Sequence, residues 1–352
     1  MGSDVTEETL RHLLENTIRY NLSKESYEFL KTFLGWLANQ GLRVSTRYRY
    51  AEIIGDFLRW LETRNVKVER ISLKDVEFYF SAVRERGLKT STMHWYVVGI
   101  KKLLKYLYFL TDDDRYRKLY EKVKVPKIQQ VLPEVLSSVE VLRLLEALDD
   151  AKYRALFSLI YETGCRISEA LNLKMKDLSV DEYGIKVFFR RSKSEARAVR
   201  VIVFSKTILG WLELHAAKND PEAYVFYGRD PYKRMARSTA TYVLKRAAMK
   251  AGIKKKVHPH LLRHTRATEL YRFFKELEMM RWFGWKTRKM IDIYSKITQE
   301  DVEEKYIRKF LGGEKVSHDR QLLSVAICPK CKAINPPNAK YCYSCGHSLN
   351  QS

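Results

Sequence analysis

Apolar residues recur at helical spacing through the first third of the chain. Residues 23–41 carry large apolar side chains three and four positions apart, behind a start signal at Ser23 and before a stop at Gly41. The same period predicts three further helices, over residues 45–64, 72–87 and 90–110. Ser72 and Asp75 fit a capping box at the start of one of them. No clear strand pattern interrupts this part, so it predicts a helical domain.

The pattern changes after the fourth predicted helix. Residues 122–136 are basic, contain two prolines and lack a helical period, which is typical of a linker between domains. Beyond the linker, helical periods return around one segment, residues 184–204, that reads as a strand pair. The helices predicted for this second domain span residues 137–148, 153–164, 238–253, 260–274 and 287–297.

These patterns predict a mainly α fold in which the second domain mixes helices with a small antiparallel sheet. A chain of 352 residues is long enough for two such cores and a small appendage. The predicted parts are an N-terminal extension (1–22), a helical domain (23–121), a linker (122–136), a second domain (137–313), a tether (314–327) and a C-terminal module (328–352).

The charge balance points to a polyanionic partner. The chain has 65 lysines and arginines against 42 acidic residues, a net charge of +23, which favours nucleic acid. The alternative is a lysine-rich surface of the kind found in thermophiles. No apolar run approaches the roughly 18 residues of a membrane span, and the first ten residues are polar and acidic. We therefore expect a cytoplasmic protein without a signal peptide or a membrane partner.

Four of the five cysteines form two CxxC pairs near the C-terminus. Ten residues separate the pairs, and this spacing is typical of two knuckles that hold a structural zinc. The predicted ligands are Cys328, Cys331, Cys342 and Cys345. His347 is an alternative ligand, and disulfides or free thiols are the competing interpretation. So short a module cannot bury much core, so the metal is expected to hold it folded.

Several side chains of the second domain could handle a DNA phosphodiester. Arg166 begins a predicted helix, and Arg263 lies one turn after His260. Two guanidinium groups suit the extra negative charge on phosphate oxygens, because each is permanently charged and bidentate. A tyrosine oxygen such as that of Tyr294 can attack phosphorus and leave again when the step reverses. Lys193, at the tip of the strand pair, could protonate the departing 5′ oxygen, and His260 could assist the tyrosine.

Each of these residues alone has a plainer explanation, because a single arginine is usually a surface ion pair and a single tyrosine usually packs in a core. Their order, however, resembles the catalytic pattern of the tyrosine recombinase family, the lambda-type and Xer-like integrases. The segment TGCRISEALNLKMKDL, with Glu169, is similar to the box around the family's first arginine, and HPHLLRHTRATEL, with His264, is similar to its HxLRH box. FGWKTRKMIDIYSKI is similar to the nucleophile segment, with Tyr294 nine positions after Trp285. The family usually has histidine at the Trp285 position, but either ring can donate an N–H to a phosphate oxygen.

The resemblance covers residues 20–312 and implies a SAM-like core-binding domain followed by a catalytic domain. It implies an enzyme that cleaves and rejoins double-stranded DNA at a specific site, through a 3′-phosphotyrosyl link and without a catalytic cofactor. The implied catalytic residues are Arg166, Lys193, His260, Arg263, Trp285 and Tyr294, supported by Glu169 and His264. It also implies a homo-tetramer on paired sites that exchanges strands through a Holliday junction. A role for accessory DNA-bending proteins stays open, and the zinc ribbon is not part of the family pattern.

Cations gather near helix starts that lack carboxylates. Each alone fits a solvated helix face, and their clustering makes contact with DNA phosphates an equal alternative. The predicted DNA-binding residues are Arg43, Arg47, Lys89, Lys101, Lys102 and Lys105 in the first domain and Lys245 and Arg246 in the second.

Three other functions compete with the recombinase interpretation. A type IB topoisomerase uses similar residues but relaxes supercoils without exchanging strands. A second alternative is a non-catalytic DNA-binding protein on the same scaffold, and a third is an adaptor that acts through its ribbon. The ribbon could contact DNA or protein. The lysine-rich and tyrosine-rich composition, together with the ribbon, suggests an archaeal or mobile-element source.

Overall fold

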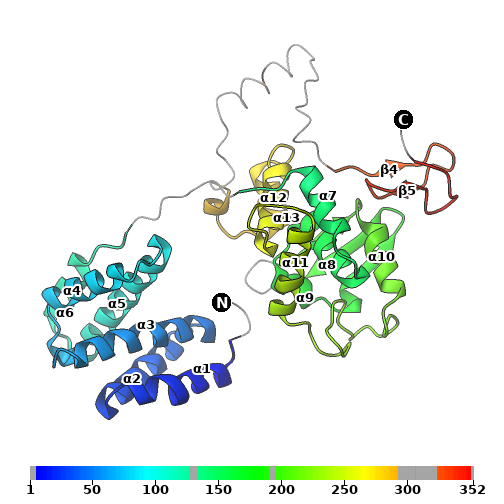
Figure 1. Ribbon diagram of the computed structural model, residues 1–352. Helices are drawn as coiled ribbons and strands as arrows, with labels where there is room; N and C mark the ends of the chain where they lie inside the picture. Colours follow the sequence, from blue (N-terminus) through cyan, green and yellow to red (C-terminus); the bar gives the residue numbers. More distant parts are fainter. Residues whose placement is uncertain (1–4, 127–133, 191–195, 292–305, 307–322, 350–352) are drawn as a thin grey trace. The chain divides into compact units, whose positions relative to one another are not determined.

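The computed structural model forms two compact units, Met1–Gln130 and Val131–Ser352 (Figure 1). It describes residues 5–126, 134–190, 196–291, 306 and 323–349. In these ranges no helix is both long enough and apolar enough to span a bilayer.

The first unit is helical throughout its described residues. Its helices are α1 (Glu7–Leu13), α2 (Lys24–Asn39), α3 (Val44–Glu62), α4 (Leu73–Glu85), α5 (Thr90–Thr111) and α6 (Asp114–Lys122). A π-helical turn (Leu14–Ile18) and two short 3₁₀ turns (Arg19–Asn21 and Val68–Arg70) complete it. The four predicted helices are therefore present, and α1 and α6 accompany them. The predicted extension contributes to this unit, because Leu10 and Ile18 are buried in its core.

Local signals set the helix ends of the first unit as predicted. The Ser23 hydroxyl accepts the Ser26 N–H at the start of α2. Ser72 and Asp75 form the full capping box at the start of α4. The helices pack closely, because a Cβ at Gly99 of α5 would lie only 2.7 Å from Cγ2 of Ile53 on α3. Glycine at this position therefore allows the two long helices to touch.

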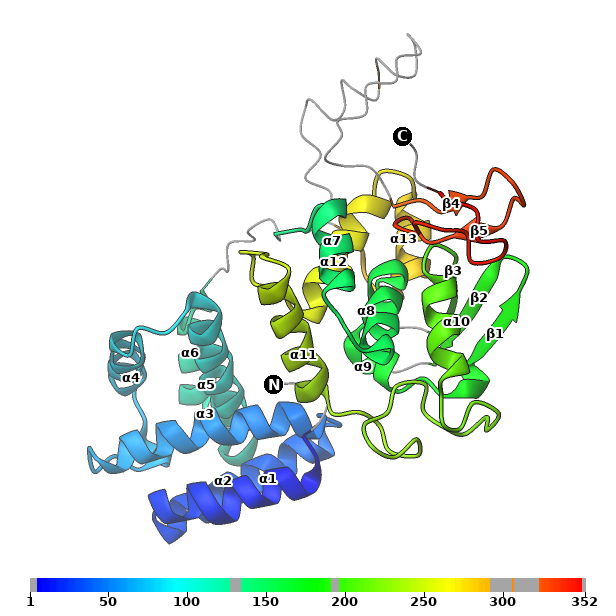
Figure 2. The same ribbon diagram turned by 45° about the vertical axis from the view of Figure 1, so that its right-hand side comes forward.

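The second unit surrounds one buried helix with further helices and a small sheet. Its helices are α7 (Ser138–Glu146), α8 (Ala151–Thr163), α9 (Ile167–Leu171), α10 (Ser205–Glu213), α11 (Arg237–Lys250), α12 (Pro259–Leu270) and α13 (Glu276–Phe283). Short 3₁₀ turns lie at Met175–Asp177 and Arg288–Met290. Residues 155–163 of α8 are all buried, and α10 and α12 pack against this helix (Figure 2). Its buried residues are mostly apolar because the helix lies inside the unit, and Ser158, Glu162 and Thr163 are its buried polar residues.

The sheet is antiparallel and has the strand order β1-β2-β3. Its strands are β1 (Leu178–Asp181), β2 (Gly184–Phe189) and β3 (Arg197–Val201). Ile185 and Val187 pair with Val201 and Val199, and all four side chains are buried. The predicted strand pair is thus confirmed as β2 and β3, with β1 added at the edge. At the C-terminal end, β4 (Ala326–Ile327) pairs with β5 (Ile334–Asn335) in the ribbon.

Candidate active site and candidate metal centre

Arg166 lies where α8 ends and α9 begins. Gly164 ends α8 in the left-handed conformation, with φ 60°, and Arg166 is the N-cap residue of α9. Glu169, on the first turn of α9, accepts the Arg166 backbone N–H at 2.8 Å and its Nη1 at 3.3 Å. The Glu169 side chain is 4% exposed and that of Arg166 is 26% exposed. Part of the Arg166 guanidinium can therefore meet a ligand while the carboxylate holds it.

Among the residues that the structure describes, Arg263 on α12 is the largest fully buried side chain, with 1% of its surface exposed. Its Nη1 donates to the Gly164 carbonyl at 2.5 Å, and its Nη2 donates to the Phe283 carbonyl at 3.2 Å. The approach is tight, because a Cβ on Gly164 would lie 2.1 Å from the Phe283 ring. Arg263 thus ties the turn before Arg166 to the end of α13.

Two histidines of α12 lie near Arg166 and Arg263. The rings of His260 and His264 meet edge to face, with centroids 4.5 Å apart. Burial, followed by the nearby His264, Arg263, His258 and Arg166, lowers the pKa of His260 to about 3. Burial, followed by His258 and Arg263, lowers the pKa of His264 to about 4. The His260 imidazole is therefore neutral at pH 7 and can accept a proton.

Trp285 follows directly after α13. Gly284 ends that helix in the left-handed conformation, with φ 64°, and the Trp285 backbone N–H returns to the Met280 carbonyl at 2.9 Å. Its ring is 4% exposed and stacks on Phe283 at 4.8 Å. The Arg263 guanidinium lies 5.8 Å from the Trp285 ring. The structure therefore brings together the predicted residues from α9, α12 and the end of α13.

Comparison with known proteins agrees with this geometry. Residues 134–301 match the phage integrase family. The chain is 29% identical over 287 residues to tyrosine recombinase XerD of Bifidobacterium longum, covering 76% of this chain and 92% of that protein. It is 27% identical over 297 residues to XerD of Chlorobaculum tepidum, covering 78% and 93%. These matches make the chain similar to tyrosine recombinases.

Solved structures of the family share the fold. A XerH recombinase bound to its palindromic difH substrate has a TM-score of 0.62 at 21% identity, covering 87% of this chain and 99% of that one. A lambda integrase dimer bound to a COC′ core site has a TM-score of 0.63 at 16% identity, covering 88% of each chain. The mainly α fold with a small antiparallel sheet is thus confirmed. The similarity to tyrosine recombinases indicates an enzyme that cleaves and rejoins DNA.

Two residues of the recombinase pattern lie outside the described residues. Lys193 falls in the segment between β2 and β3, and Tyr294 falls in the segment after Ile291. The predicted helix over 287–297 is described only as far as Ile291. The roles assigned to the lysine and the tyrosine therefore stay predictions.

Sequence reasoning missed a buried polar network behind the recombinase site. Arg266 donates Nε to the Glu162 carbonyl at 3.0 Å and Nη1 to Glu269 at 3.2 Å, and the Tyr161 hydroxyl donates to Glu269 at 2.9 Å. These contacts join the end of α8 to α12. The signal was present, because Arg263, Arg266 and Glu269 follow one another at intervals of three along one helix.

Arg197 and Glu162 were also missed. Arg197 points inward from β3, pairs with Glu169 and is 5% exposed. The Glu162 carboxylate accepts backbone N–H groups of Val203 and Phe204, each at 2.8 Å, and so anchors the chain between β3 and α10. The sequence contained a signal for Arg197. This arginine stands two residues before Val199 on the strand, so it shares the face of the buried valines.

The lowered imidazole pKa values predict an acid-sensitive site. Both lie below the ordinary value of 6.5, so between about pH 6.5 and 4 the unfolded chain binds protons that the folded protein does not. The stability contribution is therefore fully present above pH 6.5 and is lost as the pH falls. Urea unfolding at pH 7, 5.5 and 4.5 should show a shallower loss for a His260→Gln, His264→Gln double variant than for the wild type. A His260 ring that titrates near 6.5 by NMR would contradict this account.

The predicted DNA-binding cations have different environments. Arg43 and Lys89 are exposed N-cap residues of α3 and α5, whose first turns contain no acidic residue. Lys105, Lys245 and Arg246 are also exposed. Three others make contacts within the first unit, where Arg47 pairs with Glu7, Lys101 donates to the Val123 carbonyl at 2.8 Å and Lys102 lies 4.8 Å from the Trp36 ring. Contact of these cations with DNA stays a prediction. The exposed cations suit it best, because their side chains are open to solvent.

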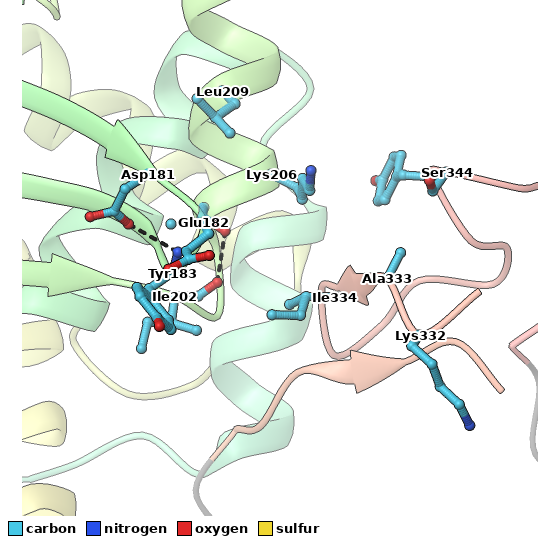
Figure 3. Close-up of a pocket in the computed structure, with 13 residues that line it drawn as sticks. Asp181, Glu182, Tyr183, Ile202, Lys206, Leu209, Lys332, Ala333, Ile334 and Ser344 are labelled. Atoms are coloured by element: carbon cyan, nitrogen blue, oxygen red, sulfur yellow. Dashed lines mark hydrogen bonds between the residues drawn. The ribbon is translucent and has the colours of Figure 1, made fainter. Parts of the chain in front are cut away.

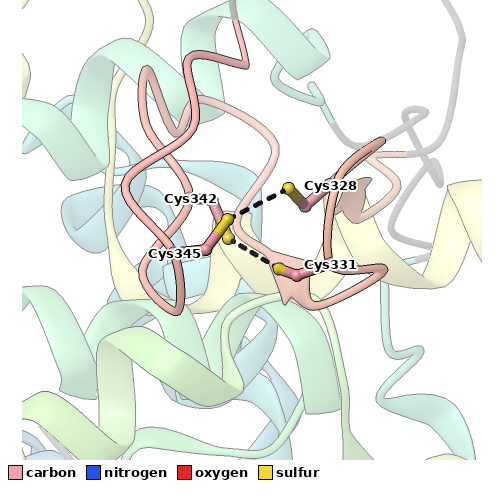
Figure 4. A group of neighbouring side chains, drawn as sticks. All are labelled: Cys328, Cys331, Cys342 and Cys345. Atoms are coloured by element: carbon pink, nitrogen blue, oxygen red, sulfur yellow. Dashed lines mark hydrogen bonds between the residues drawn. The ribbon is translucent and has the colours of Figure 1, made fainter.

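The four C-terminal cysteines converge on one point (Figure 4). All four sulfurs lie within 4.8 Å of one another, with Cys328 and Cys345 at 3.6 Å and Cys331 and Cys342 at 3.5 Å. A tetrahedral zinc with bonds of about 2.3 Å would separate its sulfurs by about 3.8 Å, whereas a disulfide bond is about 2.05 Å long. The donor set and its spacing therefore fit a structural zinc. His347 is exposed and is not among the clustered ligands.

Both cysteine knuckles have the same backbone turn. The Lys332 N–H returns to the Cys328 carbonyl, and the Gly346 N–H returns to the Cys342 carbonyl, each at 2.9 Å. Lys332 and Gly346 both adopt positive φ, 60° and 69°. Glycine suits this conformation and lysine does not, so the second knuckle is the less strained of the two.

A surface pocket elsewhere in the second unit contains none of the recombinase residues (Figure 3). Tyr183 and Lys206 line it on one side, and Ile334 and Ser344 of the ribbon line it on the other. The predicted catalytic residues that the structure describes therefore lie apart from this pocket.

Proposed function

We propose that this chain is a site-specific recombinase that cuts DNA through Tyr294 and rejoins it to a partner strand. The observation that carries the proposal is the convergence of Arg166, His260 and Arg263. Arg263 donates to the Gly164 carbonyl, two residues before Arg166, and His260 lies one turn before Arg263 on α12. The similarity to tyrosine recombinases supports the same reaction.

In the proposed reaction the Tyr294 oxygen attacks the scissile phosphorus and the bond to the 5′ oxygen breaks. The product is a 3′-phosphotyrosyl link, and a 5′ hydroxyl from the partner duplex later reverses the step. The tyrosine proton passes to the neutral His260 ring, and Lys193 protonates the leaving 5′ oxygen. Because the covalent link conserves the bond energy, the rejoining step requires no ATP.

Arg166 and Arg263 have different roles toward the phosphate. Arg166 is partly exposed, so it can donate to the nonbridging oxygens as negative charge develops. Arg263 has five N–H donors, of which two already reach the Gly164 and Phe283 carbonyls. It therefore combines a positioning role with the cationic field at the site. The Trp285 ring, held beside it, completes the phosphate-binding set.

The partner proposed is double-stranded DNA carrying a specific recombination site. Exposed cations at the helix starts of α3 and α5 suit phosphate contacts, because the helix dipole adds to their charge. The XerH structure holds its difH substrate, and a lambda integrase tetramer is bound to a Holliday junction. By analogy we propose a homo-tetramer on two sites that exchanges strands through such a junction. The four clustered cysteines support Zn²⁺ as the structural ion of the ribbon.

Covalent trapping tests this function. The protein would be mixed, in EDTA, with nicked duplexes pooled from its source DNA, then denatured, digested and analysed by mass spectrometry. We expect a nucleotide adduct on the peptide that contains Tyr294, and sequencing of the trapped DNA identifies the site. Product analysis on that DNA then separates a recombinase, which exchanges strands, from a topoisomerase, which only relaxes them. Tight binding without any adduct would instead favour the non-catalytic alternative.

A further inference from the structure

Arg197 is the first residue of β3 and lies outside the recombinase pattern described above. Its side chain is 5% exposed and lies on the same inward face of the strand as Val199 and Val201. A guanidinium stays charged even at such a site, so it has to be paired and hydrogen-bonded. The partners of Arg197 therefore indicate what it holds in place.

These partners come from three separate elements. Nη2 lies 2.9 Å from Glu169 Oε2 and Nη1 lies 3.3 Å from Oε1, so the guanidinium fork meets the α9 carboxylate with two donors. Nε donates to the Trp282 carbonyl, in the last turn of α13, at 2.8 Å. The guanidinium also lies 4.6 Å from the ring of Phe189 on the paired strand β2. One side chain thus joins β3 to α9 and to α13.

Glu169 is shared between two arginines. Its carboxylate accepts the backbone N–H and Nη1 of Arg166 while it pairs with Arg197. The three side chains together carry one net positive charge. Without Arg197, the carboxylate would neutralise Arg166 alone, and the charge that faces a phosphate would fall to zero. The buried carboxylate would also draw the Arg166 guanidinium inward, away from a ligand.

The contact with Trp282 acts on the other side of the site. The Trp282 carbonyl is among the last four of α13, which lack partners within the helix, and a cation at a helix C-terminus is favourable. Only Phe283 and Gly284 separate Trp282 from Trp285. Arg197 therefore fixes the helix end from which the Trp285 ring projects.

We propose that Arg197 is a positioning residue for DNA cleavage. By pairing with Glu169 it keeps that carboxylate from neutralising Arg166 and leaves Arg166 oriented toward the phosphate, and through the Trp282 carbonyl it sets the turn that carries Trp285. Arg197 itself does not touch DNA. This inference rests on the proposed function, because that function assigns Arg166 and Trp285 to the scissile phosphate.

The test compares two arginines of one strand in the full-length protein. Arg200, three residues further along β3, pairs with the partly exposed Asp181 and provides the matched control. The rate of Tyr294 adduct formation would be measured in a single turnover, at saturating concentrations of the nicked duplex recovered by trapping, per folded chain. We expect Arg197→Ala to lower this rate by about 100-fold, the scale of a misplaced reactive geometry. Arg200→Ala should keep the wild-type rate.

Two further variants distinguish positioning from simple stabilisation. Arg197→Lys keeps the charge but loses the fork, so we expect an intermediate rate, and this variant carries the test if Arg197→Ala fails to fold. Adding Glu169→Gln to Arg197→Ala removes the unpaired carboxylate. Because the two residues share one network, the double variant should cleave no more slowly than Arg197→Ala alone.

A purely structural Arg197 would lower the melting temperature but leave the rate per folded chain at the wild-type value. That result, for Arg197→Ala or Arg197→Lys, would overturn the proposal and leave the proposed function intact. A wild-type protein that forms no adduct would overturn the proposed function, and the positioning role with it. Adduct formation by the wild-type protein therefore distinguishes failure of the positioning role from failure of the proposed function.

Discussion

Replacing Tyr294 with phenylalanine is expected to abolish the covalent link between this protein and DNA while duplex binding persists. The substitution removes only the hydroxyl oxygen, which is the atom that attacks phosphorus in the proposed reaction. Deleting a nucleophile from an enzyme costs about 10⁶ in rate, so the adduct should fall below detection. The adduct would be followed on denaturing gels, and duplex binding by fluorescence anisotropy, with the DNA recovered by trapping.

Tyr306 provides the matched control for this experiment. It lies twelve positions beyond Tyr294 and is 66% exposed, so it is a second tyrosine that DNA could meet. Tyr306→Phe should form the adduct at the wild-type rate. If the Tyr294→Phe protein still became attached to DNA, the nucleophile would be another residue, and the peptide that carries the nucleotide would identify it.

Loss of the zinc ligands is expected to unfold the ribbon completely and to leave cleavage by Tyr294 measurable. Residues 323–349 contain only two short strands, each of two residues, so they bury too little apolar surface to fold alone. A structural zinc in such a module contributes about 10–16 kcal/mol of binding free energy, which becomes folding free energy. A Cys328→Ser, Cys331→Ser double variant should therefore lose bound zinc in elemental analysis and become sensitive to protease in this region.

The matched control for the ribbon is Lys330→Ala, which changes an exposed residue between the same two cysteines. This variant should keep one zinc per chain and the wild-type protease pattern. If the cysteine variant lost Tyr294 cleavage as well, the ribbon would be integral to the active site. If it kept its protease resistance without zinc, the four cysteines would not be the structural ligands.

Short-range sequence signals predict many of the helix and strand boundaries. Ser23, and Ser72 with Asp75, mark helix starts because their side chains satisfy backbone N–H groups only three positions away. Buried Ile185 and Val187 alternate with exposed positions, which marks a strand because successive side chains point to opposite faces. The ribbon was predictable for the same reason, since each CxxC pair forms a local turn.

The candidate site was predictable only in part. The order of Arg166, His260, Arg263 and Trp285 resembles a family pattern, and the structure brings these residues together. Lys193 and Tyr294 are known from that resemblance alone, because both lie outside the described residues. The helix α1 and the buried polar residues behind the site were not recognised. A local spacing was present for the polar residues, but their partners lie far away in the sequence, so the spacing alone does not show what they hold.

What the sequence alone determined is therefore the helix ends, the strand pair, the cysteine knuckles and the set of residues proposed to meet a phosphate. The tertiary structure decided which groups support them. Arg197 meets Glu169 across 28 positions and the Trp282 carbonyl across 85, and Arg263 meets the Gly164 carbonyl across 99. Such pairs have no characteristic spacing, because they form only when α8, α9, α12, α13 and β3 pack around one core. Burial then requires every charge there to find a partner, and that requirement organises the site.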